Sequence, residues 1–430
     1  MTPSKTASAV ARVCPGSAGD VPAGRSAERL PVCLVGPGWL FTSGMSYYTC
    51  RLARAMAAQH QVSVILLRRL LPRRCYPGRR RVGQPRARMT YPPGVPVCDG
   101  IDWWWGLSLL RALGFLRAQR PAVLALQWWT AAALHTYLLL AVAGRLLGAR
   151  VVLEVHELQD PGEAGLSLVR GYGRGGLRLL LRLCQGCVLH SDADRRMLED
   201  RGMPLDMPVS ISPHGPYDQY RETVPGDPAA AAAIAAVREA PRPAVTNLLF
   251  FGVIRPYKGL DDLLAVFSGL SRQEAAGLWL TVVGETWGGC TEPARLIEAS
   301  PHRDRITFVN SYVPDEVAAA AFGHADVVVL PYHRSASSGP LHVAMSWGLP
   351  VVVTEVGGLP EAARGYGGAV FVPPRDTAML KAGIMRAAGL AGQKFTDPGD
   401  WARTVTAILT AAEVTAEGPT PPAAAVRAAR

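Results

Sequence analysis

The sequence predicts an α/β protein made of two parallel-sheet halves. Short apolar runs bounded by glycine or proline alternate with longer stretches of helical period, which is typical of parallel strands joined by crossover helices. The 430 residues are 49% apolar and 18% charged, enough for two or three domains with well-formed cores. The composition therefore excludes a small disulfide-stapled scaffold.

The expected strands form two groups. In the first half they lie at residues 32–35, 62–67, 122–126, 151–155, 187–190 and 209–212. In the second half they lie at 248–252, 280–284, 306–310, 327–331 and 351–354. Ligands of such open sheets bind beyond the carboxyl ends of the strands, so the loops that follow these runs are the places to search for function.

The domain boundaries follow from the same pattern. Residues 221–246 are rich in proline and alanine and predict a linker between a domain at 30–220 and a domain at 247–395. A helix at 396–415 is expected to pack back on the first domain. Outside both domains we expect a disordered leader at 1–29 and a tail at 416–430.

One segment, 121–144, has the length of a membrane span and carries no charged side chain. It includes a proline, a glutamine, a histidine and two threonines, and it divides into an apolar run, a turn with two tryptophans and a helical stretch. We interpret it as a buried strand, a turn and a helix. The leader lacks the continuous apolar core of a signal peptide, so a cytoplasmic protein is expected.

The charged residues favour anionic partners and give no sign of a metal site. Of the 45 basic residues only four are lysines, and the net charge is +11. Eight cysteines are too few for a disulfide framework. The Cys184 and Cys187 pair lacks a second pair or histidines at zinc spacing, and Asp192 and Asp194 are interpreted as capping residues at a helix start. We therefore assign no metal and no cofactor.

Two segments of the second half predict an anion site. Arg255 and Lys258 follow a strand, and Gly259 opens a helix whose N-terminus favours negative charge. A lysine is unusual in a chain that otherwise uses arginine, which favours a functional role. Ser335, Ser337, Ser338 and Gly339 form a small polar loop, so backbone N–H groups can approach phosphate or sugar oxygens.

These segments resemble the donor-nucleotide domain of the GT-B glycosyltransferases, in particular family 4. The similarity runs from about residue 248 to 373 through FFGVIRPYKG, LTVVGE, SYVPDEV, HADVVVLPY, SSGPLHVAMSWGLPVVVT and VGGLPE. The N-terminal half is more loosely similar through SGM at 43–45, VVLEVHE at 151–157, VLHSDADRRML at 188–198 and SPHGPYDQY at 212–220. The resemblance implies two Rossmann-like domains facing each other across a cleft, and transfer from a nucleoside-diphosphate sugar with retention.

The resemblance also implies roles for individual positions. Arg255 and Lys258 match the pair that grips the donor diphosphate, and the backbone of Val313 matches the contact with the base. Gly44 matches a glycine near the diphosphate, and His156 matches a histidine facing the reacting sugar. Also expected at the donor site are Gly252, Ser335, Ser337, Ser338, Gly339, Pro340 and Leu341.

One departure from the family affects the sugar site. Family members usually carry two glutamates at the positions held here by Ser335 and Val343, and neither can accept hydrogen bonds as a carboxylate does. A Ser-Ser-Gly loop replaces that pair in some branches, so a transferase remains the expected function. The alternatives are a non-catalytic nucleotide-sugar-binding partner and a GT-B enzyme that hydrolyses or epimerises a nucleotide sugar.

The expected partners are a nucleotide-sugar donor and a glycan, lipid-linked or small-molecule acceptor. Residues 68–88 hold nine arginines and no acidic residue, and they precede three consecutive tryptophans. This stretch predicts either peripheral contact with anionic membrane lipids or a solvated loop. Nucleic acid is not expected, because aromatic residues are not interleaved with the charges.

Overall fold

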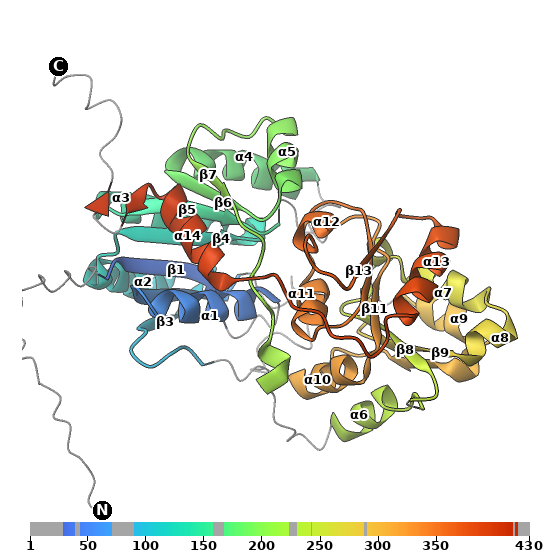
Figure 1. The fold of residues 1–430 in the computed structure, drawn as a ribbon. Coiled ribbons are helices and arrows are strands. Elements are labelled where there is room, and N and C mark those ends of the chain that lie inside the picture. Colours follow the sequence, from blue (N-terminus) through green and yellow to red (C-terminus); the bar gives the residue numbers. More distant parts are fainter. Residues whose placement is uncertain are drawn as a thin grey trace, which may run out of the picture.

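The computed structural model describes residues 29–38, 44–70, 90–157, 167–222, 230–241, 243–287, 290–415 and 418–419. They form two α/β domains, each built on one parallel sheet (Figure 1). This arrangement confirms the predicted fold class, two Rossmann-like domains. Outside the described residues lie 1–28 of the predicted leader, 416–417 and 420–430 of the tail, most of the arginine-rich stretch, Ser43, and 223–229 and 242 of the linker.

The N-terminal sheet has seven strands. Its spatial order is β3 (Val97–Asp102), β2 (Gln61–Arg69), β1 (Pro31–Pro37), β4 (Val123–Trp128), β5 (Arg150–Val155), β6 (Gly186–Leu189) and β7 (Val209–Ile211). All neighbouring strands pair in parallel, with β1 between β2 and β4. The central strands are buried on both faces, which explains why they appear in the sequence as continuous apolar runs.

Helices cover both faces of this sheet. The first core lies between the sheet and α1 (Gly44–Ala57) with α14 (Trp401–Ala411). The second core lies between the other face and α2 (Gly106–Gln119), α3 (Leu134–Leu146) and α4 (Ser167–Leu183). A further helix, α5 (Asp192–Asp200), follows β6. Segment 121–144 thus divides into β4, a short turn and α3, as interpreted from its composition.

The C-terminal sheet has six strands. Its order is β10 (Ile306–Val309), β9 (Leu278–Val283), β8 (Thr246–Phe251), β11 (Val327–Leu330), β12 (Val351–Thr354) and β13 (Ala369–Val372). All of these pairs are parallel. In both sheets the strand order reverses beside the first strand of the domain, and open α/β sheets bind ligands at that point.

The C-terminal sheet is covered in the same way. One face packs against α7 (Leu260–Ser268), α8 (Arg272–Ala276), α9 (Glu292–Glu298) and α13 (Thr377–Ala388). The other face packs against α6 (Ala231–Val237), α10 (Asp315–His324), α11 (Gly339–Ser346) and α12 (Leu359–Ala362). A two-stranded ribbon, β14 (Val414–Thr415) and β15 (Gly418–Pro419), lies near the C-terminal end.

One hydrophobic core passes through both domains. Buried residues of α1, such as Tyr48 and Leu52, belong to the same cluster as Phe322 of α10 and Leu341 of α11. Tyr47 of α1 donates a hydrogen bond to Asp315 of α10, and Glu361 of α12 accepts from the backbone N–H of Asp192 and Ala193 at the start of α5. The two domains are therefore joined by packing as well as by the chain.

Helix α14 follows the C-terminal domain in sequence but lies on the N-terminal domain, against α1, β6 and β7 (Figure 1). Gly186 in β6 permits this contact, because a Cβ there would lie 2.0 Å from the Ala411 carbonyl oxygen. Thr404 is fully buried, and its hydroxyl lies 3.3 Å from that of Ser212. Among the described residues, no helix is long and apolar enough to cross a membrane.

Candidate functional site

A cavity of about 510 Å³ opens between the two domains. The N-terminal domain contributes Glu157 after β5 and Met197 and Arg201 from the end of α5. The C-terminal domain contributes Tyr257, Lys258, residues 332–340, Val356 and Gly357, all from loops that follow strands or from the helix starts beyond them. The cavity therefore lies at the carboxyl edge of both sheets.

Lys258 ends a 3₁₀ turn, Pro256–Lys258, that leads from β8 into α7. Gly259 follows with φ 64°, and a Cβ at this glycine would lie 2.0 Å from the Pro331 carbonyl oxygen. The tight turn therefore requires glycine here. It holds the half-buried Lys258 ammonium at the cavity, 5.4 Å from the centre of the Tyr332 ring.

The pKa of Lys258 lies well below that of an exposed lysine. Burial, followed by the nearby Arg255 charge, lowers the pKa of Lys258 to about 8, while Glu157 acts in the opposite direction. Arg255 does not line the cavity; its guanidinium lies 4.2 Å from the centre of the Trp287 ring. An anion in the cavity would offset the repulsion between the Lys258 and Arg255 charges and so favour the ammonium form of Lys258.

The serine loop leads into α11, whose N-terminus faces the cavity. Ser338 caps the helix by accepting a hydrogen bond from the Leu341 N–H at 3.3 Å, and Ser335 donates to the Ser337 carbonyl at 2.7 Å. The loop packs against Gly357, where a Cβ would lie 1.7 Å from the Ser335 carbonyl oxygen. Pro340 has no N–H and the Leu341 N–H is already bonded to Ser338, so this end offers an anion the Gly339 N–H and the positive end of the helix dipole.

Two more predicted glycines lie beside this loop. A Cβ at Gly252 would lie 3.2 Å from Lys258 Nζ and 3.5 Å from Pro340 Cγ, so the glycine leaves space beneath the ammonium group. Cβ atoms at Gly44 and at Gly339 would lie 3.7 Å and 3.8 Å from the same Tyr217 ring carbon. Gly44 of the first domain and Gly339 of the second thus approach one aromatic ring from two sides.

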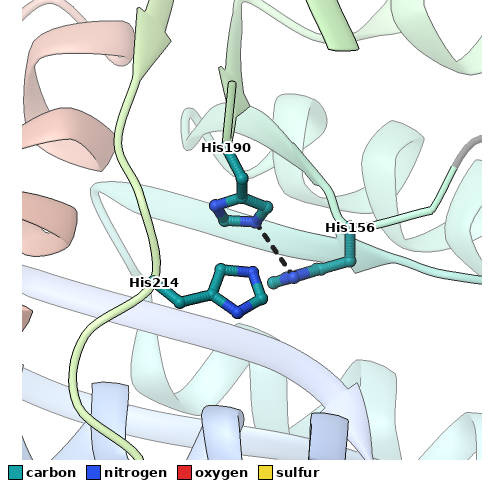
Figure 2. Close-up of side chains that lie close together, drawn as sticks. All are labelled: His156, His190 and His214. Carbon is teal, nitrogen blue, oxygen red and sulfur yellow. Dashed lines mark hydrogen bonds between the residues drawn. The ribbon is translucent and has the colours of Figure 1, made fainter. Parts of the chain in front are cut away.

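His156 is placed differently from its expected position facing the sugar. It is 5% exposed, does not line the cavity, and its ring points toward His190 and His214 (Figure 2). Its neighbour Glu157 is the residue that reaches the cavity. The structure therefore brings Lys258 and the serine loop together with Glu157 and leaves His156 beneath the surface.

The remaining predicted positions are also outside the cavity wall. Leu341 is fully buried in α11, and Val313 lies in the loop before α10, where it packs against the core. Val343, at a position where the family has a glutamate, is buried as well. The N-cap of α5 is Ser191, which accepts a hydrogen bond from the Asp194 N–H at 3.0 Å. Asp192 and Asp194, interpreted from the sequence as the capping residues, lie instead in the first turn of the helix.

Beneath the cavity lies a buried polar cluster around Glu154. Its carboxylate accepts hydrogen bonds from Tyr48 and from Gln127 Nε2, the latter at 3.1 Å. Burial is the largest single influence on the pKa of Glu154 and would raise it, but His156, His190 and the hydrogen bond from Tyr48 together outweigh burial and the pKa is lowered. Burial lowers the pKa of His190 to about 3 and that of His342 to about 4, so these imidazoles are neutral.

Several residues that line the cavity were not predicted by any motif in the sequence. Arg201 and Met197 come from the end of α5, far in sequence from any motif of the second domain. His333 lies next to the predicted loop and its Nε2 is 2.8 Å from Asp262 Oδ2. Among the described residues two groups could offer metal ligands: Asp261 with Asp262 and His333, and the three histidines 156, 190 and 214.

Comparison with known proteins identifies both domains. Residues 42–215 match the family model described as Glycosyltransferase Family 4, and residues 245–389 match the one described as Glycosyl transferases group 1. Together the two models take in most of the chain.

Individual relatives match over shorter stretches. A GDP-mannose:glycolipid 4-beta-D-mannosyltransferase of Xanthomonas campestris is 36% identical over 25% of this chain and 29% of its own length. A D-inositol 3-phosphate glycosyltransferase of Segniliparus rotundus is 32% identical over 34% of this chain and 32% of its own length. The chain therefore aligns with about a third of the length of these relatives.

The fold has solved counterparts. HepE of Anabaena in complex with UDP superposes with a TM-score of 0.58 at 14% identity, covering 89% of this chain and 99% of that one. At this identity the likeness shows the GT-B fold alone.

Proposed function

Because the chain belongs to the GT-B glycosyltransferases of the family 4 type, we propose that it transfers a sugar from a nucleoside-diphosphate sugar to an acceptor hydroxyl. The donor lies in the cavity between the domains. The observation that carries this proposal is the convergence of Lys258 and the N-terminus of α11 on one cavity at the edge of both sheets. Both features stabilise the negative charge that grows on a leaving diphosphate.

Several of the predicted donor residues have separate parts in this proposal. Lys258 binds a diphosphate oxygen directly, and Arg255 adds positive potential from its position on Trp287. Ser335, Ser337 and Ser338 shape the backbone around the phosphates, with Gly252 and Gly339 keeping the approach open. Glu157 is the carboxylate available to the sugar hydroxyls in place of the family's usual pair.

We propose that configuration is retained. The acceptor oxygen bonds to the anomeric carbon on the face from which the diphosphate leaves, and the acceptor proton passes to the leaving phosphate oxygen. The anomeric bond to phosphate breaks with its electron pair, so no protein nucleophile is needed. Inversion would instead require a general base on the acceptor side, and Glu157, which lines the cavity, is the candidate.

The reaction is tested by incubating the full chain with UDP-, GDP- and ADP-sugars and candidate acceptors. Transfer predicts nucleoside-diphosphate release that depends on the acceptor, with a product whose anomeric configuration by NMR matches the donor. Release without acceptor indicates hydrolysis, and binding without release indicates a non-catalytic partner. Either result contradicts the proposed transfer, and an inverted product contradicts retention alone.

Diphosphate stabilisation by Lys258 and α11 leads us to propose that transfer needs no metal ion at the diphosphate. Brief treatment with EDTA, or omission of Mg²⁺ and Mn²⁺, is expected to leave turnover within about twofold of the untreated rate, because the protein supplies the charge itself. Activity that is lost on chelation and restored by Mg²⁺ or Mn²⁺ would show that transfer does need a metal ion at the diphosphate.

We further propose that the acceptor is presented at an anionic membrane, and the surface over α2, α3 and α4 supports this. Exposed apolar side chains gather on these adjacent helices, with exposed arginines among them: Leu107, Leu110, Leu139, Val142, Leu146, Tyr172 and Leu179, with Arg111, Arg117, Arg145, Arg174 and Arg182. At the edge of this surface the Arg69 guanidinium lies 5.3 Å from the centre of the Trp104 ring. One relative is named for a glycolipid acceptor.

Binding to vesicles tests this surface. We expect the full chain to bind vesicles containing phosphatidylglycerol and to release them as salt rises, since each arginine near the surface contributes about 1 kcal/mol that ions screen. A Leu107→Ser/Leu110→Ser variant should bind more weakly, whereas Met379→Ser, on the other domain, serves as the matched control. Equal binding to neutral vesicles, or none to either kind, contradicts the proposal.

A further inference from the structure

Three histidines from three successive strand ends lie close together in the N-terminal domain (Figure 2). His156 follows β5, His190 follows β6, and His214 follows β7. Each is 4–5% exposed, and one ring nitrogen of each lies within 4.8 Å of those of the other two. Buried histidines gathered in this way require either hydrogen-bond partners or a ligand.

The outer nitrogen of each ring faces an oxygen atom. His190 Nδ1 is 2.8 Å from the Ser212 carbonyl oxygen, and His214 Nδ1 is 3.1 Å from the Tyr217 hydroxyl. His156 Nε2 is 3.5 Å from Glu154 Oε2. Oxygen partners on the outer nitrogens are the usual arrangement for metal-binding histidines, because they fix the tautomer and direct the other nitrogen to the ion.

The inner nitrogens cannot all be satisfied by neutral side chains alone. A carbonyl only accepts, so His190 Nδ1 carries hydrogen and its Nε2 presents a lone pair, 2.9 Å from His156 Nδ1. If neutral His156 donates to that lone pair, its own Nε2 faces the Glu154 carboxylate as a second acceptor. In the other tautomer, two lone pairs meet at 2.9 Å.

The unsatisfied ring nitrogens could be satisfied either by a second proton on His156 or by a bound cation, and His214 distinguishes these two possibilities. A second proton on His156 would satisfy both His190 and Glu154. It would still leave His214 Nε2, which is buried and has no hydrogen-bond partner, unsatisfied. A cation at the meeting point satisfies all three inner nitrogens at once, and the aim of the His214 ring in Figure 2 agrees with this.

We propose that His156 Nδ1, His190 Nε2 and His214 Nε2 bind a divalent transition metal ion, with Zn²⁺ the best match. Imidazole nitrogens suit this ion, and bonds of 2.0–2.1 Å place ligand nitrogens about 3.3 Å apart in a tetrahedral site. The 2.9 Å pair needs to open by only a few tenths of an ångström. The sequence had suggested no metal, because the ligands are too widely spaced to form a motif.

The position of the ion defines its role. It joins the ends of three strands directly beneath Glu157, and the His342 ring of α11 stacks 5.0 Å from that of His214. Three protein ligands leave the fourth position of the ion to water. None of the three histidines lines the cavity, so the ion lies away from the diphosphate and takes no part in bond cleavage.

Metal content provides the direct test. The full chain, produced without a histidine tag, is expected to hold close to one zinc per chain by mass spectrometry after extensive buffer exchange. His190→Gln and His214→Gln should each lower this at least fivefold. His333→Gln, in the partly buried second group of candidate ligands, should keep the wild-type content.

A second measurement covers variants that fail to fold. Wild-type protein stripped of metal and loaded with Co²⁺ should show the strong visible bands of tetrahedral cobalt, and Zn²⁺ should raise its Tm. Wild-type chain that takes up neither ion overturns the proposal. So does zinc that is lost from His333→Gln, or zinc that survives unchanged in folded His190→Gln and His214→Gln.

Discussion

Lys258→Ala is expected to lower kcat/KM for the nucleotide-sugar donor by about 10²-fold or more, comparable to the loss of one preorganised oxyanion donor. The ammonium group is held at the cavity by a glycine turn that permits little adjustment, so no neighbouring group can easily move into its place. Because the charge on the diphosphate grows as the sugar leaves, kcat should fall as well as affinity.

The control for this substitution is Lys381→Ala. Lys381 lies on α13 and pairs with Glu274 at 2.8 Å, so its removal changes the same residue type and net charge outside the cavity. We expect wild-type kinetics from Lys381→Ala. Wild-type kinetics from purified, folded Lys258→Ala would instead remove Lys258 from the diphosphate site.

The second large effect is on pH dependence. The pKa of Lys258 is about 8 in the chain without donor, so the ammonium form predominates below this pH and is lost above it. The cationic form is the one that binds the diphosphate. Therefore kcat/KM for the donor should hold below pH 8 and then fall up to tenfold per pH unit, since this parameter reports the free enzyme.

The Lys258→Arg variant tests whether titration of Lys258 causes the decline in kcat/KM above pH 8. A guanidinium stays charged throughout this pH range, so the decline should disappear in the variant even if its maximal rate is lower. The decline in kcat should begin at higher pH than in kcat/KM, because bound diphosphate stabilises the ammonium form. A decline that persists unchanged in Lys258→Arg would show that another group titrates.

The fold was largely predictable because buried parallel strands appear in the sequence as short continuous apolar runs. Each expected apolar run contains or overlaps a strand of the structure. One edge strand of each large sheet was missed, as was the short ribbon of β14 and β15. Residues 97–102 read VCDGID, where aspartates and a glycine interrupt the pattern, and residues 369–372 form a four-residue run with exposed Phe371. Edge strands are covered on fewer sides, so their composition resembles that of loops.

The candidate site was only partly predictable. Lys258 and the serine loop reach the cavity because short motifs set local geometry: a strand end, a turn and a helix start. Whether a side chain faces the cavity or the core depends on packing between distant segments. For this reason the sequence could not show that His156 is buried while Glu157 lines the cavity. For the same reason no motif in the sequence indicated that Arg201 lines the cavity.

The histidine cluster shows the same limit over longer distances. His156, His190 and His214 are separated by more than twenty residues each, and only the parallel order of β5, β6 and β7 brings their strand ends together. Adjacency in a sheet is a property of topology, so no spacing rule within the sequence could reveal it. The shared core that joins α1 to α10 and α11 is unpredictable for the same reason.

A crystal structure of the chain with a nucleoside diphosphate bound tests the donor site most directly. We expect the diphosphate in the cavity between the domains, with one oxygen accepting a hydrogen bond from Lys258 Nζ and another facing the Gly339 N–H at the start of α11. A diphosphate bound elsewhere, or bound in the cavity without contact to Lys258, would contradict this expectation.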